Sequence, residues 1–438
     1  MAPVSESAPE AIGLRTHPLT GLVQGALWAA AASVGLVGSV FSGDGWGTMG
    51  PLLSLLVALV GGLLVGMGFG FLTWAFTRYV IDGAELRINT GVITKASRRI
   101  PYERLQSVDI AEPLVARLFG LAELRIEMAG GKDSRTSLRF LTLADAQDLR
   151  RVLLAKAHGE TDTAVALDEQ RTIITVVPPQ RVVIGTLLSL DFLFAAVGSL
   201  VLLGGALWFD QVIVLLGGII PLGTWLVQIV GKRVLQQWDF TLSRGANGLR
   251  IERGLLSRTS QTIPFARVQG IAVKEPFVWR RFGWQRLEVD VAGFAAHGDD
   301  DGTDSSSTLL PISDGPLADA IIAELIPGSA VESVSRIRAP RRSWLFAPIG
   351  WRYRWVGANQ STFVAREGWI ERTTDIVPHR KTQSVELRQG PIQRRRHVAT
   401  VEVHTPQGPV DADGQHLDEL DARSILLDQL ERARVARG

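Results

Sequence analysis

Arginine clusters are the residues in this sequence whose chemistry is easiest to assign. Two similar patterns each place three guanidinium groups near expected turns: Arg98, Arg99 and Arg104, and then Arg280, Arg281 and Arg286. Guanidinium groups pair with phosphate oxygens, so anionic lipid headgroups are one candidate ligand. The alternative is a solvated basic face that only sets the orientation of the chain at a membrane.

A third basic segment, residues 341–355, interleaves aromatic rings with arginines. Its candidate contact residues are Trp344, Trp351, Arg352, Arg354 and Trp355. Aromatic rings beside cations favour the headgroup region, which would place the segment on a membrane surface. The alternative is packing against the second of the repeats described below, or against helix ends. Nucleic acid is not an expected partner, because the net charge of only +2 provides no attracting field.

The residue types needed for catalysis or metal binding form no recognisable pattern. The chain has no cysteine, which excludes thiol nucleophiles and thiolate metal sites. His379, His397, His404 and His416 do not have the spacing of a known metal motif. The acidic insertion at 298–307 lacks the closing glutamate of a calcium loop, so we expect a mobile loop. No nucleophile elbow or phosphate loop is present, and we expect no metal, no cofactor and no enzymatic activity.

Long apolar stretches must position these polar segments. Four contain no Lys, Arg, Glu or His: Leu22–Phe41, Pro51–Thr77, Val182–Trp208 and Val212–Val230. A bilayer core needs roughly 20 apolar helical residues, so each stretch predicts a membrane span. The joints at 42–50 and 209–211 are short, and they predict two helical hairpins. All 46 Lys and Arg residues lie outside the stretches and joints, which places both termini and every polar domain in the cytoplasm.

Two features inside these stretches suggest further roles. Asp191 is their only ionisable group, and such a residue is by default a candidate for transport or proton relay. The span could instead begin near Gly185, which would leave Asp191 close to the interface and bonded to Gln228. Three glycines recur at every fourth position, which indicates a helix-packing face or general glycine enrichment: Gly62, Gly66 and Gly70.

The polar segments contain three copies of one sequence unit. Residues 86–127 align without a gap with residues 249–290, and a more divergent third copy begins at Phe363. Three residue types recur at equivalent positions of the copies: Gly91, Gly254 and Gly368; Pro101, Pro264 and Pro378; Gln106, Gln269 and Gln383. The chain is therefore expected to carry three related domains.

Each copy predicts short antiparallel strands followed by one helix. In copy one, four segments alternate as half-buried strands do: 86–88, 106–110, 124–127 and 138–140. Gly91 supplies a turn, and Pro101 belongs at a strand end because it cannot donate to a ladder. A helix follows the N-cap Thr142, with Asp145 three residues later. The corresponding helices are expected at 316–326 and 416–435.

The repeat carries a motif, Ile-Pro-x-x-Arg-x-Gln followed by Glu-Pro-x-Val-x-Arg-x-Phe-Gly, at 100–120 and 263–283. This motif resembles the bacterial pleckstrin-homology (PH) domain, and its alternation with hairpins is similar to the YdbT-type family of multi-pass membrane proteins. Copy three keeps Pro378 and Gln383 but has Val398-Ala399 in place of Phe-Gly. The resemblance implies PH-like barrels that bind lipid or protein and have no catalytic core. Some members of that group are associated with tolerance of bacteriocins or envelope stress.

The expected fold class is membrane α-helical hairpins plus three α+β PH-like repeats, each an antiparallel β-barrel capped by a C-terminal helix. The expected boundaries run in order: a disordered tail 1–20, a hairpin 21–77, a domain 78–160, a linker 161–180, a hairpin 181–231, a domain 232–330, an interfacial segment 331–357 and a domain 358–438. We expect a multi-pass adaptor at the cytoplasmic face of the cell membrane. Its partners would be the lipid bilayer, anionic headgroups, and either another protein or a second copy in a homo-oligomer. The alternative is a transporter or resistance factor whose four membrane helices are active.

Overall fold

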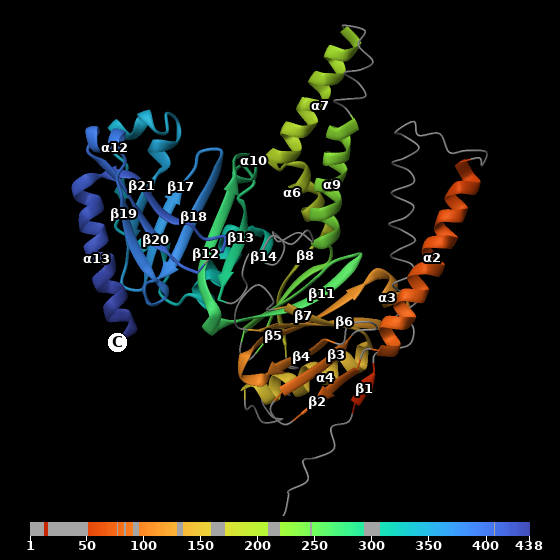
Figure 1. The fold of residues 1–438 in the computed structure, drawn as a ribbon. Coiled ribbons are helices and arrows are strands. Elements are labelled where there is room, and N and C mark those ends of the chain that lie inside the picture. The colour runs from red at the N-terminus through yellow and green to blue at the C-terminus, as the bar shows by residue number, and fades with distance from the viewer. Residues whose placement is uncertain are drawn as a thin grey trace, which may run out of the picture. The chain divides into compact units, whose positions relative to one another are not determined.

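The computed structural model divides the chain into two compact units (Figure 1). The first is Met1–Arg171 with Leu256–Thr262, and the second is Thr172–Leu255 with Ile263–Gly438. The structure describes these residues: 13–15, 51–76, 78–82, 85–90, 96–128, 135–158, 171–208, 220–245, 248–292, 307–406 and 408–438. The first apolar stretch, the turn at Gly91 and nearly all of the acidic insertion lie outside them.

Copy one forms a PH-like fold from two antiparallel sheets and a helix. The first sheet has the order β1 (Gly13–Arg15), β2 (Arg78–Ile81), β3 (Glu85–Thr90) and β4 (Ala96–Pro101). The second contains β5 (Leu105–Pro113), β6 (Leu121–Met128) and β7 (Arg135–Thr142), with α3 (Leu114–Leu118) between β5 and β6. The closing helix α4 (Leu143–His158) begins after Thr142, whose Oγ1 accepts a bond from the Asp145 amide at 3.1 Å. The predicted strands, the N-cap and the helix are confirmed.

The expected tail contains structure at one point. Gly13 and Arg15 pair with Val80 and Arg78, so β1 adds a strand to the first sheet. The prediction of disorder through residue 20 is wrong at this strand. The short alternating run offered no signal, because its stability comes from hydrogen bonds to β2.

Copies two and three repeat the same plan, and they lie in the second unit except for residues 256–262. Copy two contains β8 (Thr172–Val177), β9 (Phe240–Arg244), β10 (Gly248–Arg253), β11 (Ser257–Pro264), β12 (Val268–Pro276), α10 (Phe277–Arg280), β13 (Trp284–Val291), β14 (Thr308–Asp314) and α11 (Gly315–Leu325). Copy three contains β15 (Ile337–Arg338), β16 (Trp355–Ala358), β17 (Thr362–Glu367), β18 (Glu371–Pro378), β19 (Ser384–Arg388), α12 (Pro391–Arg395), β20 (Val398–His404), β21 (Ala412–Asp418) and α13 (Glu419–Arg437). Strand β8 lies in the expected linker, and the final helix starts at Glu419 because β21 occupies the residues before it.

The repeated prolines and glycines have the predicted structural roles. The prolines end β4, β11 and β18, and each is followed by a 3-10 turn: η1 (Tyr102–Arg104), η3 (Phe265–Arg267) and η8 (His379–Lys381). Gly254 and Gly368 have φ angles of 110° and 84°, which side chains rarely adopt. A Cβ on Gly368 would also lie 1.8 Å from the Glu371 carbonyl oxygen. Glycine is therefore required at this turn.

Consecutive copies share β-sheets, which the sequence analysis did not anticipate. Strand β18 of copy three pairs with β12 of copy two, so that Glu371 lies opposite Pro276 and Arg372 opposite Glu275. The result is one seven-stranded sheet, β14-β13-β12-β18-β17-β16-β15. The part of β11 in the first unit joins β5 in the same way. There, the equivalent residues Ser257 and Arg258 lie opposite Pro113 and Glu112, so the register of the two junctions is identical.

The apolar stretches form helices where they are described: α2 (Pro51–Phe76), α6 (Pro179–Leu187), α7 (Leu190–Trp208) and α9 (Ile220–Gln236). No single helix among the described residues is both long and apolar enough to cross a bilayer. Helix α6 and residues 190–205 of α7 reach the required length and apolar character when they are taken together. These two helices meet at a bend of 52°. The third stretch is therefore not one continuous helix. Ser189 interrupts it, because its hydroxyl bonds to the Thr186 carbonyl and accepts the Phe192 amide at the start of α7.

The first sheet junction makes stability depend on pH through Asp109. Its Oδ1 is buried without a hydrogen-bond partner among the described residues, and Oδ2 accepts from Ser107 at 3.3 Å. Burial, together with nearby Glu127, raises the pKa of Asp109 to about 7, although Arg150 opposes the shift. The folded state therefore favours the protonated acid. The stabilisation is fully present below about pH 4, where the unfolded carboxyl titrates, and is lost as the pH rises through 7.

Asp109→Asn should remove this dependence. We expect the wild-type free energy of unfolding to fall by about 1–3 kcal/mol more than that of the variant between pH 4 and pH 8. Chemical denaturation of both proteins in the same detergent, at a series of pH values, measures the difference. Parallel pH profiles would show that Asp109 is not buried as an acid.

Candidate membrane interface

A buried tryptophan attaches the bent helix pair to copy two. Trp279 of α10 is almost fully buried, and its indole Nε1 donates to the Gly185 carbonyl of α6 at 3.1 Å. A Cβ on Gly185 would lie 2.2 Å from Cδ1 of Ile312 and 3.0 Å from the Trp279 ring, so the helix backbone rests directly on the domain. Trp284 meets the same indole edge-to-face, with 6.5 Å between centroids. The corner between α6 and α7 is thus fixed by packing.

Asp191 lies just beyond this corner, in the first turn of α7. Its Oδ2 accepts a hydrogen bond from Nη2 of Arg233, in the last turn of α9, at 2.6 Å. The expected partner Gln228 is replaced by this arginine. A carboxylate at a helix N-terminus and a guanidinium at a helix C-terminus both complement the helix dipoles. Asp191 therefore links the two helices at their base.

The copy-two arginines surround the same corner but differ in exposure. Arg286 lies 5.6 Å from the Trp279 ring, and burial lowers its pKa. Arg280 donates to the Trp369 carbonyl at 2.5 Å and covers the Phe277 ring. Only Arg281 is exposed to solvent. Two of the three predicted ligand-binding arginines thus have structural roles.

The copy-one arginines do not form one patch. Arg98 and Arg99 lie on β4 opposite Ile88 and Arg87, so their side chains point to opposite faces of the sheet. Arg104 is exposed on η1. The structure does not bring these three predicted residues together.

Most of the segment 341–355 packs on copy three, not on copy two. Its two 3-10 turns, η6 (Arg341–Leu345) and η7 (Gly350–Tyr353), precede β16. The buried Ser343 hydroxyl donates to the His416 carbonyl at 2.6 Å, and Phe346 stacks on the His416 ring at 4.4 Å. Trp355 is buried between the guanidinium groups of Arg336 and Arg366, at 4.9 and 5.2 Å.

Four other predicted residues of this region differ in how far they reach solvent. Arg354 is half-buried near Glu367, and burial lowers its pKa. Trp351 is half-buried, with the exposed Arg352 over its ring at 5.4 Å. Trp344 is 51% exposed, so it remains available for contact with lipid. Part of the segment therefore packs on protein, although on copy three and not on copy two, and contact with a membrane surface stays a prediction for the exposed Trp344 and Arg352.

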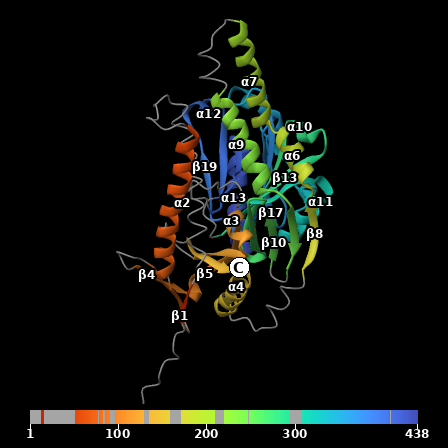
Figure 2. The same ribbon diagram turned by 90° about the vertical axis from the view of Figure 1, so that its right-hand side faces the viewer.

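Exposed apolar side chains gather at one end of the second unit, and the sequence analysis missed all of them except Trp344. Figures 1 and 2 both show α10 and α12 at the end from which α7 extends. Five large apolar residues of this region are at least half exposed: Phe277, Phe282, Trp344, Ile349 and Ile392. Arg281 and the run 394–396 lie beside them in the sequence. The only signal in the sequence was the Phe-Gly pair of the motif, which includes Phe282.

The glycine row lies on the buried side of α2. Gly66 and Gly70 are buried and Gly62 is half-buried, whereas the neighbouring Leu64 is largely exposed. Helix packing at this row stays a prediction.

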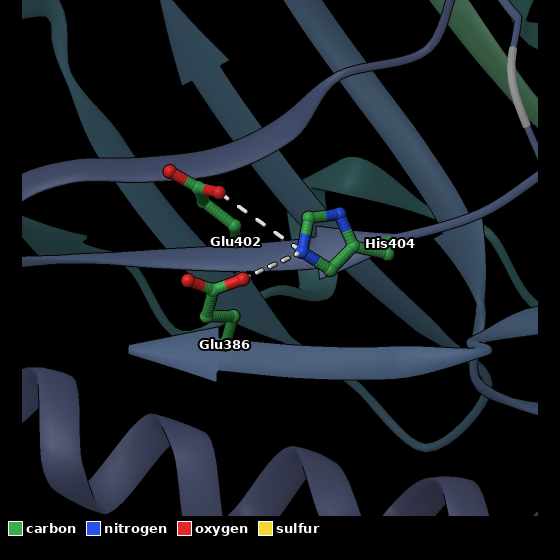
Figure 3. A group of neighbouring side chains, drawn as sticks. All are labelled: Glu386, Glu402 and His404. Atoms are coloured by element: carbon green, nitrogen blue, oxygen red, sulfur yellow. Dashed lines mark ion pairs between the residues drawn. The ribbon is translucent and has the colours of Figure 1, made fainter. Parts of the chain in front are cut away.

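Two carboxylates and a histidine converge on the outer face of copy three (Figure 3). Nε2 of His404 lies 3.4 Å from Glu386 and 4.0 Å from Glu402. The three donor atoms lie within 4.8 Å of one another, which is compatible with a metal ion after small rotations. However, Arg388 already bonds Glu402 at 2.9 Å and supplies a competing positive charge. The group is therefore a cluster of acidic side chains that would bind a further cation, and a metal ion is one candidate.

Comparison with known proteins agrees with the repeated fold. The sequence profile of the bacterial PH domain family matches residues 29–157, 192–326 and 321–434. The UPF0699 transmembrane protein YdbT of Bacillus subtilis (strain 168) is 24% identical over 305 residues. That alignment covers 62% of this chain and 60% of the length of the relative.

Trp279→Ala tests the attachment of the helix corner. It removes a buried indole and leaves the Gly185 carbonyl without its donor, so we expect a loss of about 3–5 kcal/mol in unfolding free energy. The matched control is Trp344→Ala, whose exposed ring should contribute less than about 0.5 kcal/mol. Thermal unfolding of the purified full chain compares them, and equal effects would contradict the assigned role.

Proposed function

The chain belongs to the bacterial PH domain family, and from this premise we propose that it is a non-enzymatic scaffold anchored in the cell membrane. The proposed anchor is the pair of helical hairpins, with both termini and all three PH-like copies in the cytoplasm. Support comes from the absence of Lys and Arg from the apolar stretches and their joints. A relative that carries the name of a transmembrane protein adds to this support.

One observation carries the proposal: helices α7 and α9 expose large apolar side chains. Phe194 and Leu200 of α7 and Val227 of α9 are mostly exposed. An exposed apolar surface on two neighbouring helices is costly in water and is characteristic of contact with lipid. The bend at Ser189 and the packing of Trp279 hold this surface in a fixed direction relative to copy two.

The end of copies two and three near this corner would lie at the headgroups. Phe282 and Trp344 would enter the interface, and exposed arginines such as Arg281 would meet anionic lipid. The copies would then present their remaining surfaces to a protein partner. By the resemblance described above, the proposed setting is tolerance of envelope stress or bacteriocins.

The alternative, a transporter acting through its membrane helices, gains no support from Asp191. A proton relay needs a carboxylate that can exchange protons along a path. Asp191 instead has a close ion pair with Arg233 at the base of the helices. We therefore favour the scaffold.

Cysteine labelling tests the proposed topology in a chain that has no cysteine of its own. Gln211→Cys, in the joint of the second hairpin, should react with a membrane-impermeant maleimide in intact cells. Gln360→Cys, exposed between β16 and β17, should react only after lysis. Labelling of Gln360→Cys in intact cells would overturn the cytoplasmic placement, and protection of Gln211→Cys until lysis would overturn the hairpin.

A further inference from the structure

The same antiparallel strand contact joins consecutive copies at two places in the chain. In each case, the fourth strand of a copy adds to the free edge of the preceding copy: β11 on β5 and β18 on β12. In copy three, the strand equivalent to β5 and β12 is β19, which pairs only with β20 among the described residues. In copy one, the strand equivalent to β11 and β18 is β4, which is the last strand of its sheet, after β3, among the described residues. The series of junctions is thus incomplete at both ends.

We propose that β4 of one molecule pairs with β19 of a second copy of this chain, by the same antiparallel contact that joins consecutive repeats. An open strand edge presents unpaired amides and carbonyls, and another strand satisfies them. The contact joins different surfaces of the two partners. It is therefore heterologous, and it produces a ring or an open row of molecules.

The register of the two internal junctions fixes the register of the third. Gln261 of β11 and Asp375 of β18 are equivalent to Arg98 of β4 in the aligned copies. Asp375 lies opposite Ala272 of β12, and the residue equivalent to Ala272 in copy three is Glu386. Arg98 of one molecule therefore lies opposite Glu386 of the other.

The charges of the two edges are complementary at this register. Glu386 lies opposite Glu402 on β20, and Glu402 lies opposite Asp413 on β21, so three carboxylates form a row on one face. Like charges opposite each other on neighbouring strands are unfavourable. A guanidinium group from Arg98 would continue this row and reduce its repulsion. The cation that binds the cluster of Glu386, Glu402 and His404 (Figure 3) is then Arg98 of the neighbouring molecule.

Burial gives independent support. The positions that the following copy covers in copies one and two are exposed in copy three. Ala272 is fully buried, whereas the equivalent Glu386 has 56% of its side chain exposed. Asp290 is 1% exposed, whereas the side chain of the equivalent His404 is 44% exposed. Copy three thus lacks the cover that the other copies have.

Disulfide trapping in native membranes tests the proposal with the full chain. One tagged chain carries Arg98→Cys and a second, differently tagged chain carries Glu386→Cys; mild oxidation should link them as a heterodimer. Arg99→Cys with Glu386→Cys is the control, because a slip of one residue moves the thiol to the opposite face. The positive control is Lys274→Cys with Thr373→Cys in one chain, which the internal junction places opposite each other.

Charge exchange in the same membranes tests the pairing of Arg98 with Glu386. Here the chains carry no introduced cysteines, and a bifunctional cross-linker that reacts with lysines measures the yield of dimer. Arg98→Glu alone should reduce the dimer yield by up to about fivefold, and Arg98→Glu in one chain with Glu386→Arg in the other should restore it. The proposal is overturned if the internal control oxidises and the heterodimer does not form. It is also overturned by equal trapping at Arg99 or by a charge exchange that restores nothing. Neither readout depends on which side of the membrane the copies occupy.

Discussion

The structure depends on hydrogen bonds between strand edges of consecutive repeats. A PH-like barrel built from two sheets leaves the first strand of its second sheet with an open edge, and such an edge tends to pair. Here the fourth strand of the next copy closes it, at β5 and again at β12. Copies two and three are consequently not independent modules on a flexible tether. They share one seven-stranded sheet.

This junction also explains the buried acids, which are otherwise hard to place. Asp375 is buried opposite Ala272, and burial and neighbouring acids raise its pKa well above the ordinary value. Asp290 accepts a hydrogen bond from Thr405 of copy three, and burial raises its pKa to about 6. Outer-face positions become interior ones where copies meet. Polar residues there are tolerated in their protonated or hydrogen-bonded forms.

Local patterns in the sequence predicted what local forces determine. Alternation predicted strands such as β3 and β5, the prolines marked strand ends, and Thr142 marked the start of α4. The junctions were missed because strand pairing between distant segments has no local signal. The same reason applies to Trp279, whose partner Gly185 is supplied by a helix of another part of the chain. The arginines were assigned together by their proximity in sequence, but a strand directs Arg98 and Arg99 to opposite faces.

Hydrogen exchange of the backbone amides in β12 and β18 tests the shared sheet most directly. Strand β12 is bonded on both sides, to β13 and to β18, so its amides should exchange as slowly as those of the interior strand β13. The amides of β18 that face β12 should be equally protected. Rapid exchange of the β18 amides that face β12, with β13 still protected, would show that the copies are separate domains and would contradict the account.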